Sequence, residues 1–419
     1  MIQEVKLLSF GRLLEQTPIT ALPWQEFAPA TNEKSINCRQ MESLHEKPRS
    51  VLADSDQAVS FAELFFDLVF VFAITQVVHL IHGAFDWVHV GRAMLVFWLV
   101  WWAWTQFTWA LNAADTRHHL VQLGTMIATA IAFFMAVSVP ESFARSSWWF
   151  AVAYVAGRGI GLLIYLWVTW QDPAMRAAVR TFSVLSIAGL IAVLIGGYFG
   201  GTLQYWFWGL AIALDVMAAI LGGSNEAWNL HPRHFAERHG LFVIIALGET
   251  LIVAASAVTE EYWDGYLLLV SLLSVGITSC LWWIYFFRAK DKLEHAVAEK
   301  TGSNRSTLAR DVFSLMHFPL LCGLIIYAFA IEEAMLHPDE VMSFAARIAL
   351  ALGIFIFSTG IVLTIWRATG KILYGRLFLT CIISVAIVSI IGLHTMWTMG
   401  IALIGLISMC VMEEIRVRS

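Results

Sequence analysis

The sequence predicts an all-α integral membrane protein with about twelve transmembrane helices in two parallel six-helix repeats. Of its 419 residues, 59% are hydrophobic and only 14% are charged, whereas soluble domains carry roughly 25% charged residues. Apolar stretches of about 18 or more residues are typical of membrane helices. Twelve such stretches occur, at about 60–81, 91–111, 119–139, 146–169, 180–200, 203–221, 238–259, 266–287, 309–331, 344–366, 372–393 and 395–412. This composition excludes a soluble protein with a single membrane anchor.

The distribution of basic residues predicts how the chain is oriented. When the loops are assigned alternately to the two sides of the membrane, 22 of the 26 Lys and Arg residues fall on the side of the N-terminus. Because basic residues gather in cytoplasmic loops, we expect both termini to be cytoplasmic and the number of spans to be even. Residues 1–59 form a polar tail that we expect to be poorly ordered, and residues 413–419 form a cytoplasmic C-terminus.

An internal repeat is indicated by short matches that recur in the same order. "FAEL" at Phe61 returns as "FAER" at Phe235, 174 residues later. Further pairs follow: Gly91 with Gly265, Trp109 with Trp283, Arg158 with Arg347, and Arg180 with Arg376. We therefore predict a first six-helix repeat at 60–221, a cytoplasmic loop at 222–237 and a second repeat at 238–412. Six helices is an even number, so both repeats enter the membrane from the same side and are parallel.

Charged side chains inside the predicted helices form a candidate polar core. Each costs roughly 2.5–3.5 kcal/mol to insert and usually faces the interior of a helix bundle. The candidates are Glu63, Asp67, Arg158, Asp215, Glu237, His239, Glu249 and Arg347. Glu63 and Asp67 lie four residues apart, so they share one helix face. The rise per residue places Thr75 and Glu249 at equal depth, beyond the midplane of the membrane.

Structural and functional interpretations of these charges both remain open. In the structural one, Glu63 is a charge at a helix start and Asp67 is the partner of an arginine. Arg158 and Arg347 are then equivalent anchors that each neutralise a carboxylate, with Asp215 the natural partner of Arg158. In the functional one, Asp67 and Glu249 are singled out because neither has an acidic counterpart in the other repeat. Glu63 has one, Glu237, so we interpret Glu63 as shared scaffold and Asp67 as a separate feature.

Metal, cofactor and enzyme functions find little support. "HPRHFAERH" brings together His231, His234 and His239, but Pro232 interrupts the spacing and no zinc pattern results. We expect these histidines to lie at a solvated interface. The five cysteines form no paired motif, and no nucleotide-binding or catalytic motif occurs in a supporting context. We expect no cofactor, no metal and no nucleic-acid partner; an intramembrane enzyme remains a third alternative.

Two stretches carry a family resemblance. "ELFFDLVFVFAITQ" from Glu63 and "ERHGLFVIIALGET" from Glu237 resemble the bacterial low temperature requirement protein A (LtrA) family, over roughly residues 59–412. The resemblance implies a polytopic protein of the bacterial inner (cytoplasmic) membrane that is linked by name to growth in the cold. It implies no particular molecular function.

A more distant resemblance concerns mechanism. The first helix is similar to that of bacterial and lysosomal potassium channels built from six-helix repeats, whose signature is Phe-Ser-Asp followed by an apolar stretch that ends in Ala-Ile. Here the signature falls on Phe65, Phe66, Asp67, Ala73 and Ile74. In that family the helix lines the pore, the Asp belongs to a polar network, and two-repeat members are dimers. This chain departs at Phe66, which replaces Ser, and at Leu241, which aligns with Asp67 in the second repeat.

The leading hypothesis is an ion or small-solute conduit, either a channel or a carrier. Segments 60–81 and 238–259 would line the path, with Asp67 and Glu249 as key groups and Arg158 and Asp215 in support. A monovalent cation or a proton is the expected substrate, the lipid bilayer the main partner, and a homodimer the expected assembly. The alternative is a non-transporting membrane protein of cold or envelope stress adaptation that acts through partners or lipids. A hydrated path that touches Asp67 would distinguish the two.

Overall fold

The computed structural model describes residues 51–53, 57–81, 85–170, 172–222, 228–256 and 265–418. Within these ranges the chain is helical apart from short connections and two isolated bridges, Leu52 with Ala114 and Val341 with His394. The all-α prediction is therefore confirmed. The prediction of a poorly ordered tail at 1–59 falls for the most part, at 1–50 and 54–56, outside the described residues.

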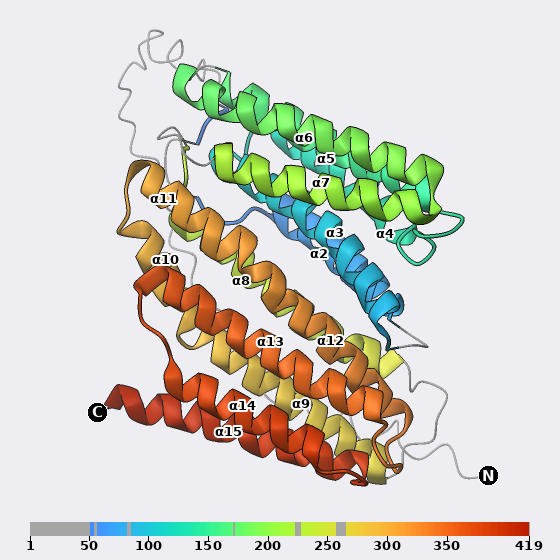
Figure 1. The fold of residues 1–419 in the computed structure, drawn as a ribbon. Coiled ribbons are helices and arrows are strands. Elements are labelled where there is room, and N and C mark those ends of the chain that lie inside the picture. The colour runs from blue at the N-terminus through green and yellow to red at the C-terminus, as the bar shows by residue number, and fades with distance from the viewer. Residues whose placement is uncertain are drawn as a thin grey trace, which may run out of the picture. The chain divides into compact units, whose positions relative to one another are not determined.

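The long helices account for every apolar stretch of the sequence (Figure 1). They are α2 (Phe61–His79), α3 (Trp87–Ala113), α4 (His119–Val137), α5 (Ser147–Thr169), α6 (Pro173–Phe199), α7 (Gly201–Gly222), α8 (Pro232–Ser256), α9 (Gly265–Phe286), α12 (His317–Leu336), α13 (Phe344–Thr369), α14 (Tyr374–Ser389) and α15 (Thr395–Arg418). Between α9 and α12 lie α10 (Ala289–Ala298), α11 (Gly302–Ala309) and the π-helix η2 (Arg310–Leu315).

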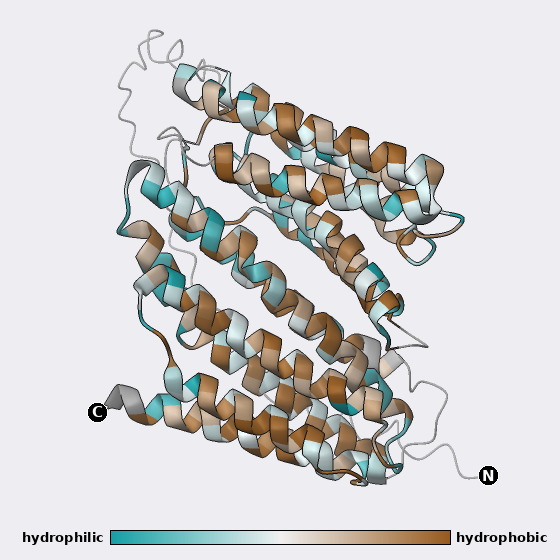
Figure 2. Cartoon of the chain, in the orientation of Figure 1, coloured by the Kyte–Doolittle hydropathy of each residue, from teal (hydrophilic) through white to brown (hydrophobic). Residues whose placement is uncertain are grey.

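The described residues contain nine helices that are long and apolar enough to cross a membrane. A multi-pass architecture is thus supported, whereas the number of twelve spans stays a prediction. One reason for the difference is α14, whose 16 residues are fewer than the roughly 20 that a helix needs to span a bilayer. Hydrophobic residues run along the length of the long helices, and hydrophilic ones gather around α10 and α11 (Figure 2).

Local sequence signals set the ends of the helices. The Ser343 hydroxyl accepts the backbone N–H of Ala346 and so caps α13, which ends at Gly370 with a left-handed φ of 71° that favours glycine. Pro232 is the first residue of α8, a position where its missing N–H costs nothing. Residues 232–237, which we expected to belong to the loop 222–237, are therefore helical.

Helix packing repeats along the chain. In the first half α2 packs on α4, α4 on α5, and α5 on α6; in the second half α8 packs on α12, α12 on α13, and α13 on α14. The two halves meet where α2 contacts α8 and α12. Large apolar side chains such as Leu163, Trp206 and Phe378 are more than 60% exposed on the outer faces. These faces suit contact with lipid, because exposed apolar side chains are favourable against hydrocarbon chains and the helices satisfy their own backbone polar groups.

Two glycines bring α12 and α13 into backbone contact. A Cβ atom at Gly323 would lie 2.6 Å from the backbone nitrogen of Phe357 and 2.9 Å from the carbonyl oxygen of Gly353. We expect Gly323→Ala to lower the free energy of unfolding by about 1–3 kcal/mol, because backbone atoms cannot move aside as a side chain can. Unfolding in mixed detergent measures this. Gly91→Ala is the control, since a Cβ there meets nothing within 4 Å; equal stability of both variants would contradict the prediction.

Candidate functional site

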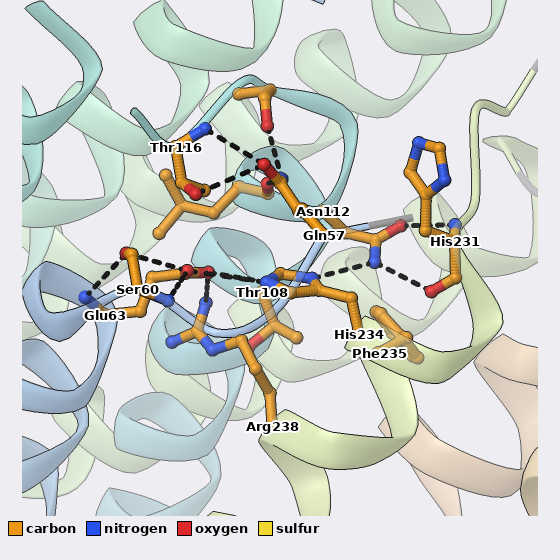
Figure 3. A network of polar contacts seen from close by, with 12 residues as sticks. Gln57, Ser60, Glu63, Thr108, Asn112, Thr116, His231, His234, Phe235 and Arg238 are labelled. Carbon is orange, nitrogen blue, oxygen red and sulfur yellow. Dashed lines mark hydrogen bonds and ion pairs between the residues drawn. The ribbon is translucent and has the colours of Figure 1, made fainter. Parts of the chain in front are cut away.

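The start of α2 aims an acidic side chain inward. Glu63 donates its backbone N–H to the hydroxyl of Ser60, and Glu63 Oε2 accepts both the N–H and the O–H of Ser60 at 2.9 Å. This reciprocal capping box satisfies donors that the first turn of a helix leaves free. It also holds the Glu63 side chain, which is only 1% exposed, beside α8 (Figure 3).

Arg238 of α8 joins the two acids of α2 into one cluster. Its Nη1 lies 3.4 Å from Glu63 Oε1, and its Nη2 donates to Asp67 Oδ1. Asp67 also accepts the indole N–H of Trp104 at 2.7 Å, and His234 Nε2 lies 3.1 Å from Glu63 Oε1. The side chains of the two acids, of Arg238 and of His234 are all at most 1% exposed. Our interpretation of Glu63 and Asp67 as separate features is therefore wrong, because one guanidinium serves both.

The cluster is tied to the C-terminal end of α3 through Asn112. The amide nitrogen of Asn112 lies 3.0 Å from His234 Nδ1 and donates to the carbonyl oxygen of His231, while its amide oxygen accepts the N–H of His231 (Figure 3). Because the amide donates to Nδ1, this network assigns the proton of a neutral His234 to Nε2, which faces Glu63. His234 and His239 are buried, so the expected solvated interface is wrong for both. No metal-binding group of three or more side chains occurs within the described residues.

His239 lies one residue beyond Arg238 but outside the ion pairs. Its Nδ1 faces the carbonyl oxygen of Phe235 at 2.8 Å. The rings of Trp104 and Phe313 pack around it at centroid distances of 5.0 Å. His239 is thus a buried packing residue, and its ring packs α8 against Trp104 of α3.

A second buried ion pair joins Arg158 of α5 to Asp215 of α7. Nη1 of Arg158 lies 3.0 Å and 3.2 Å from the two carboxylate oxygens of Asp215, and it also donates to the Tyr154 hydroxyl at 2.8 Å. Nη2 donates to the Ser186 hydroxyl, and Nε donates to the amide oxygen of Gln106. The expected pairing of Arg158 with Asp215 is present. One guanidinium connects α3, α5, α6 and α7.

Arg347 has a different environment from Arg158. It occurs in the first turn of α13, whereas Arg158 lies in the middle of α5. Its Nη1 donates to the carbonyl oxygen of Ile390 at 2.9 Å, a group left free because α14 ends at Ser389. It forms no ion pair with a carboxylate of the described residues. The expectation that Arg347 is an equivalent anchor that neutralises a carboxylate is wrong.

Glu249 of α8 contacts Thr75 of α2. The Thr75 hydroxyl donates to Glu249 Oε1, across a separation of 174 residues that equals the spacing of the predicted repeat. No cationic side chain of the described residues forms an ion pair with Glu249. Both residues are partly exposed, and Glu249 lines a cavity of about 10 Å³ between α2, α8 and α12, which is room for about one water molecule. Glu249 is thus an acid of the membrane region with only a hydroxyl partner.

Glu237 lies on another face of α8 from Arg238. It lines an open groove of about 420 Å³ together with Arg233, Lys290 and Glu294, between α8 and α10. Glu63, its predicted counterpart, is buried. The two acids therefore share neither partners nor exposure.

The sequence did not single out Trp104, and it did not match Arg238 to the two acids of α2. Pro at the first helical position marks the start of α8 at Pro232 and places Arg238 in the second turn of the helix rather than at its first residue. Ser60 followed three residues later by Glu63 is the sequence signature of the capping box. A buried indole needs a hydrogen-bond acceptor, but with 19 tryptophans in the chain that rule could not select Trp104.

Comparison with known proteins places this architecture in a family. The family model for the bacterial low temperature requirement A protein (LtrA) matches residues 58–411, from the start of α2 into α15. A protein of Rhizobium meliloti (strain 1021), described as uncharacterized, is 30% identical over 356 residues, which cover 78% of this chain and 81% of that protein. No solved structure matches the chain. The family model matches most of the chain, including both ion-pair clusters and Glu249, and the chain therefore belongs to the bacterial low temperature requirement A (LtrA) family.

Proposed function

We propose that this LtrA-family protein conducts or carries a proton or a monovalent cation across the bacterial cytoplasmic membrane, with α2 and α8 lining the path. The contact between Thr75 and Glu249 carries this proposal. Ionisable residues within membrane helices usually mark ion pathways or proton relays. Glu249 differs from Asp67 and Asp215 because no arginine of the described residues forms an ion pair with it, so it remains available to bind and release a cation.

The proposed architecture is two parallel six-helix repeats with both termini in the cytoplasm. The matching order of helix contacts in the two halves supports it, as does the excess of Lys and Arg on one side. Parallel repeats place their lead helices, α2 and α8, together at the interface of the halves. Equivalent residues then meet across that interface, as Thr75 and Glu249 do.

The buried ion pairs would serve as the frame of this path. Asp67 is 0% exposed and its carboxylate is held by Arg238 and Trp104. We assign it the role of anchoring α2 to α8 rather than that of binding a mobile ion. Arg158 and Asp215 hold the helices of the first half in the same way.

A homodimer is part of the proposal. The outward face of α2 carries exposed Phe61, Phe65 and Leu68, and that of α8 carries exposed Ile244 and Ile252. A second copy seated on these faces would surround the path with four lead helices, as the resemblance to the potassium channels implies.

The burial of Asp67 and its contact with Arg238 favour a second candidate function. A non-transporting membrane protein of cold or envelope stress adaptation would use buried charges only to join helices, and the Asp67–Arg238 contact has that form. In that case Glu249 would have no exchangeable ion to bind. Transport by the purified protein distinguishes the two functions.

Glu249→Gln is expected to abolish the ion flux of the wild-type protein in liposomes, because an amide cannot exchange a proton or balance a cation. The flux is measured with a pH-sensitive dye under a proton gradient and with potassium-loaded vesicles. Glu237→Gln is the matched control on the same helix and should keep the wild-type flux. Unchanged flux in Glu249→Gln would reject Glu249 as the exchanging group, and absence of wild-type flux would favour the non-transporting alternative.

A further inference from the structure

A cavity of about 40 Å³ lies apart from Glu249 and from the Asp67 cluster. Its walls come from α3, α5, α6 and α7 on one side and from α11 and η2 on the other. Aromatic rings such as Trp102 and Tyr165 form much of the lining. The cavity therefore separates helices of the first half from the segment that leads into α12.

Two hydroxyl groups that line this cavity have no hydrogen-bond partner among the described residues. They belong to Thr105 of α3 and Ser306 of α11, which are 2% and 1% exposed. Ser314 also lines the cavity; its oxygen accepts the indole N–H of Trp109 at 2.9 Å, so its own hydroxyl proton remains for another acceptor. An unpaired buried hydroxyl costs roughly 1–3 kcal/mol. A partner inside the cavity would remove that cost at two positions.

The charges around the cavity exclude an ion as that partner. Arg310 lines the wall, but its guanidinium is occupied by Asp311 at 2.5 Å and 2.8 Å and by the carbonyl oxygens of Ala219 and Ile220. No carboxylate is among the described residues that line the cavity. A volume of about 40 Å³ holds roughly three water molecules, at about 10–15 Å³ for each. The partner is therefore small and neutral.

We propose that the cavity binds a cluster of ordered water molecules that bridges Thr105, Ser306 and Ser314. The water cluster would connect α3 to α11 and η2. No direct hydrogen bond joins the three hydroxyls among the described residues. Gln106 forms the wall behind the cluster and donates to the carbonyl oxygen of Arg158 at 3.1 Å. The water thus lies one side chain away from the Arg158–Asp215 pair.

X-ray radiolytic footprinting of the full-length protein in detergent tests the proposal, because X-rays split ordered water into hydroxyl radicals, which oxidise the side chains beside it. Trp102 and Tyr165, 3% and 1% exposed, are expected to be modified several-fold faster than Trp208, which is 0% exposed and hydrogen bonds to the carbonyl oxygen of Val193. Modification of both residues no faster than that of Trp208 would overturn the proposal.

The stability of hydroxyl-deletion variants gives an independent sign test. If water is bound, Thr105→Val lowers the thermal midpoint, because the water loses a partner. If the cavity is dry, the same change raises the midpoint, because it removes an unsatisfied group, and this result would overturn the proposal. Thr108→Val is the control, since that hydroxyl is satisfied by the carbonyl oxygen of Trp104 in its own helix. Ser306→Ala repeats the test from the other wall.

Discussion

Replacing Arg238 by methionine is expected to lower the free energy of unfolding by about 3–5 kcal/mol, the usual cost of removing one member of a buried ion pair. The substitution leaves Glu63 and Asp67 without their shared cation, in a site where both are at most 1% exposed. Unfolding of the purified protein in mixed detergent, followed by tryptophan fluorescence, measures the change. The effect is large because both carboxylates stay buried away from water, whereas the attraction to the Arg238 guanidinium that offset this cost is lost.

The matched control for Arg238→Met is Arg233→Met. Arg233 lies on the same helix but is exposed in the groove beside α10, so its loss should change stability little. Combining Arg238→Met with Asp67→Asn should restore part of the lost stability, because the amide removes one of the uncompensated charges. If Arg238→Met were no less stable than Arg233→Met, the cluster would contribute nothing measurable to folding.

Arg158→Met is expected to cost about 3–5 kcal/mol as well, because it leaves the Asp215 carboxylate unpaired in a buried site. Arg158→Lys should recover only part of this loss. A single ammonium cannot reproduce the fork in which Nε, Nη1 and Nη2 each contact a different partner. The same unfolding assay measures both variants.

Arg347→Met is the comparison that isolates the ion pair. Arg347 is an arginine of similar burial, 5% exposed, but its guanidinium donates to a carbonyl oxygen rather than to a carboxylate. Its loss should cost about 1–3 kcal/mol, the range for a buried hydrogen-bonding group left unsatisfied. Equal losses at Arg158 and Arg347 would show that Asp215 is not the source of the larger effect.

The helices could be predicted from the sequence because a membrane-spanning helix requires a long stretch of apolar residues. An apolar stretch long enough to cross a bilayer leaves little freedom for another structure, and a helix occupies most of every predicted stretch in the described residues. The end of a helix is set more locally. Pro232 starts α8 several residues before its apolar stretch begins, so Arg238 lies in the second turn of the helix and not at its start.

Pairing between helices was harder to predict than the presence of charge. The partner of Asp215 could be inferred because Arg158 is a mid-helix cation at a similar depth. The partner of Asp67 could not be inferred in this way. It lies 171 residues away, in a segment with three histidines and two arginines that were all possible partners. Depth along a helix follows from residue count, whereas the direction of a side chain depends on how neighbouring helices are rotated.

The Asp67–Arg238 contact has a consequence for synthesis of the chain. At about 5–20 residues per second, the ribosome makes Arg238 roughly ten to thirty seconds after Asp67. Throughout that interval Glu63 and Asp67 lack the arginine that compensates them in the folded protein, and an unpaired buried acid is costly. We therefore expect the contact between α2 and α8 to form only after Arg238 has been made.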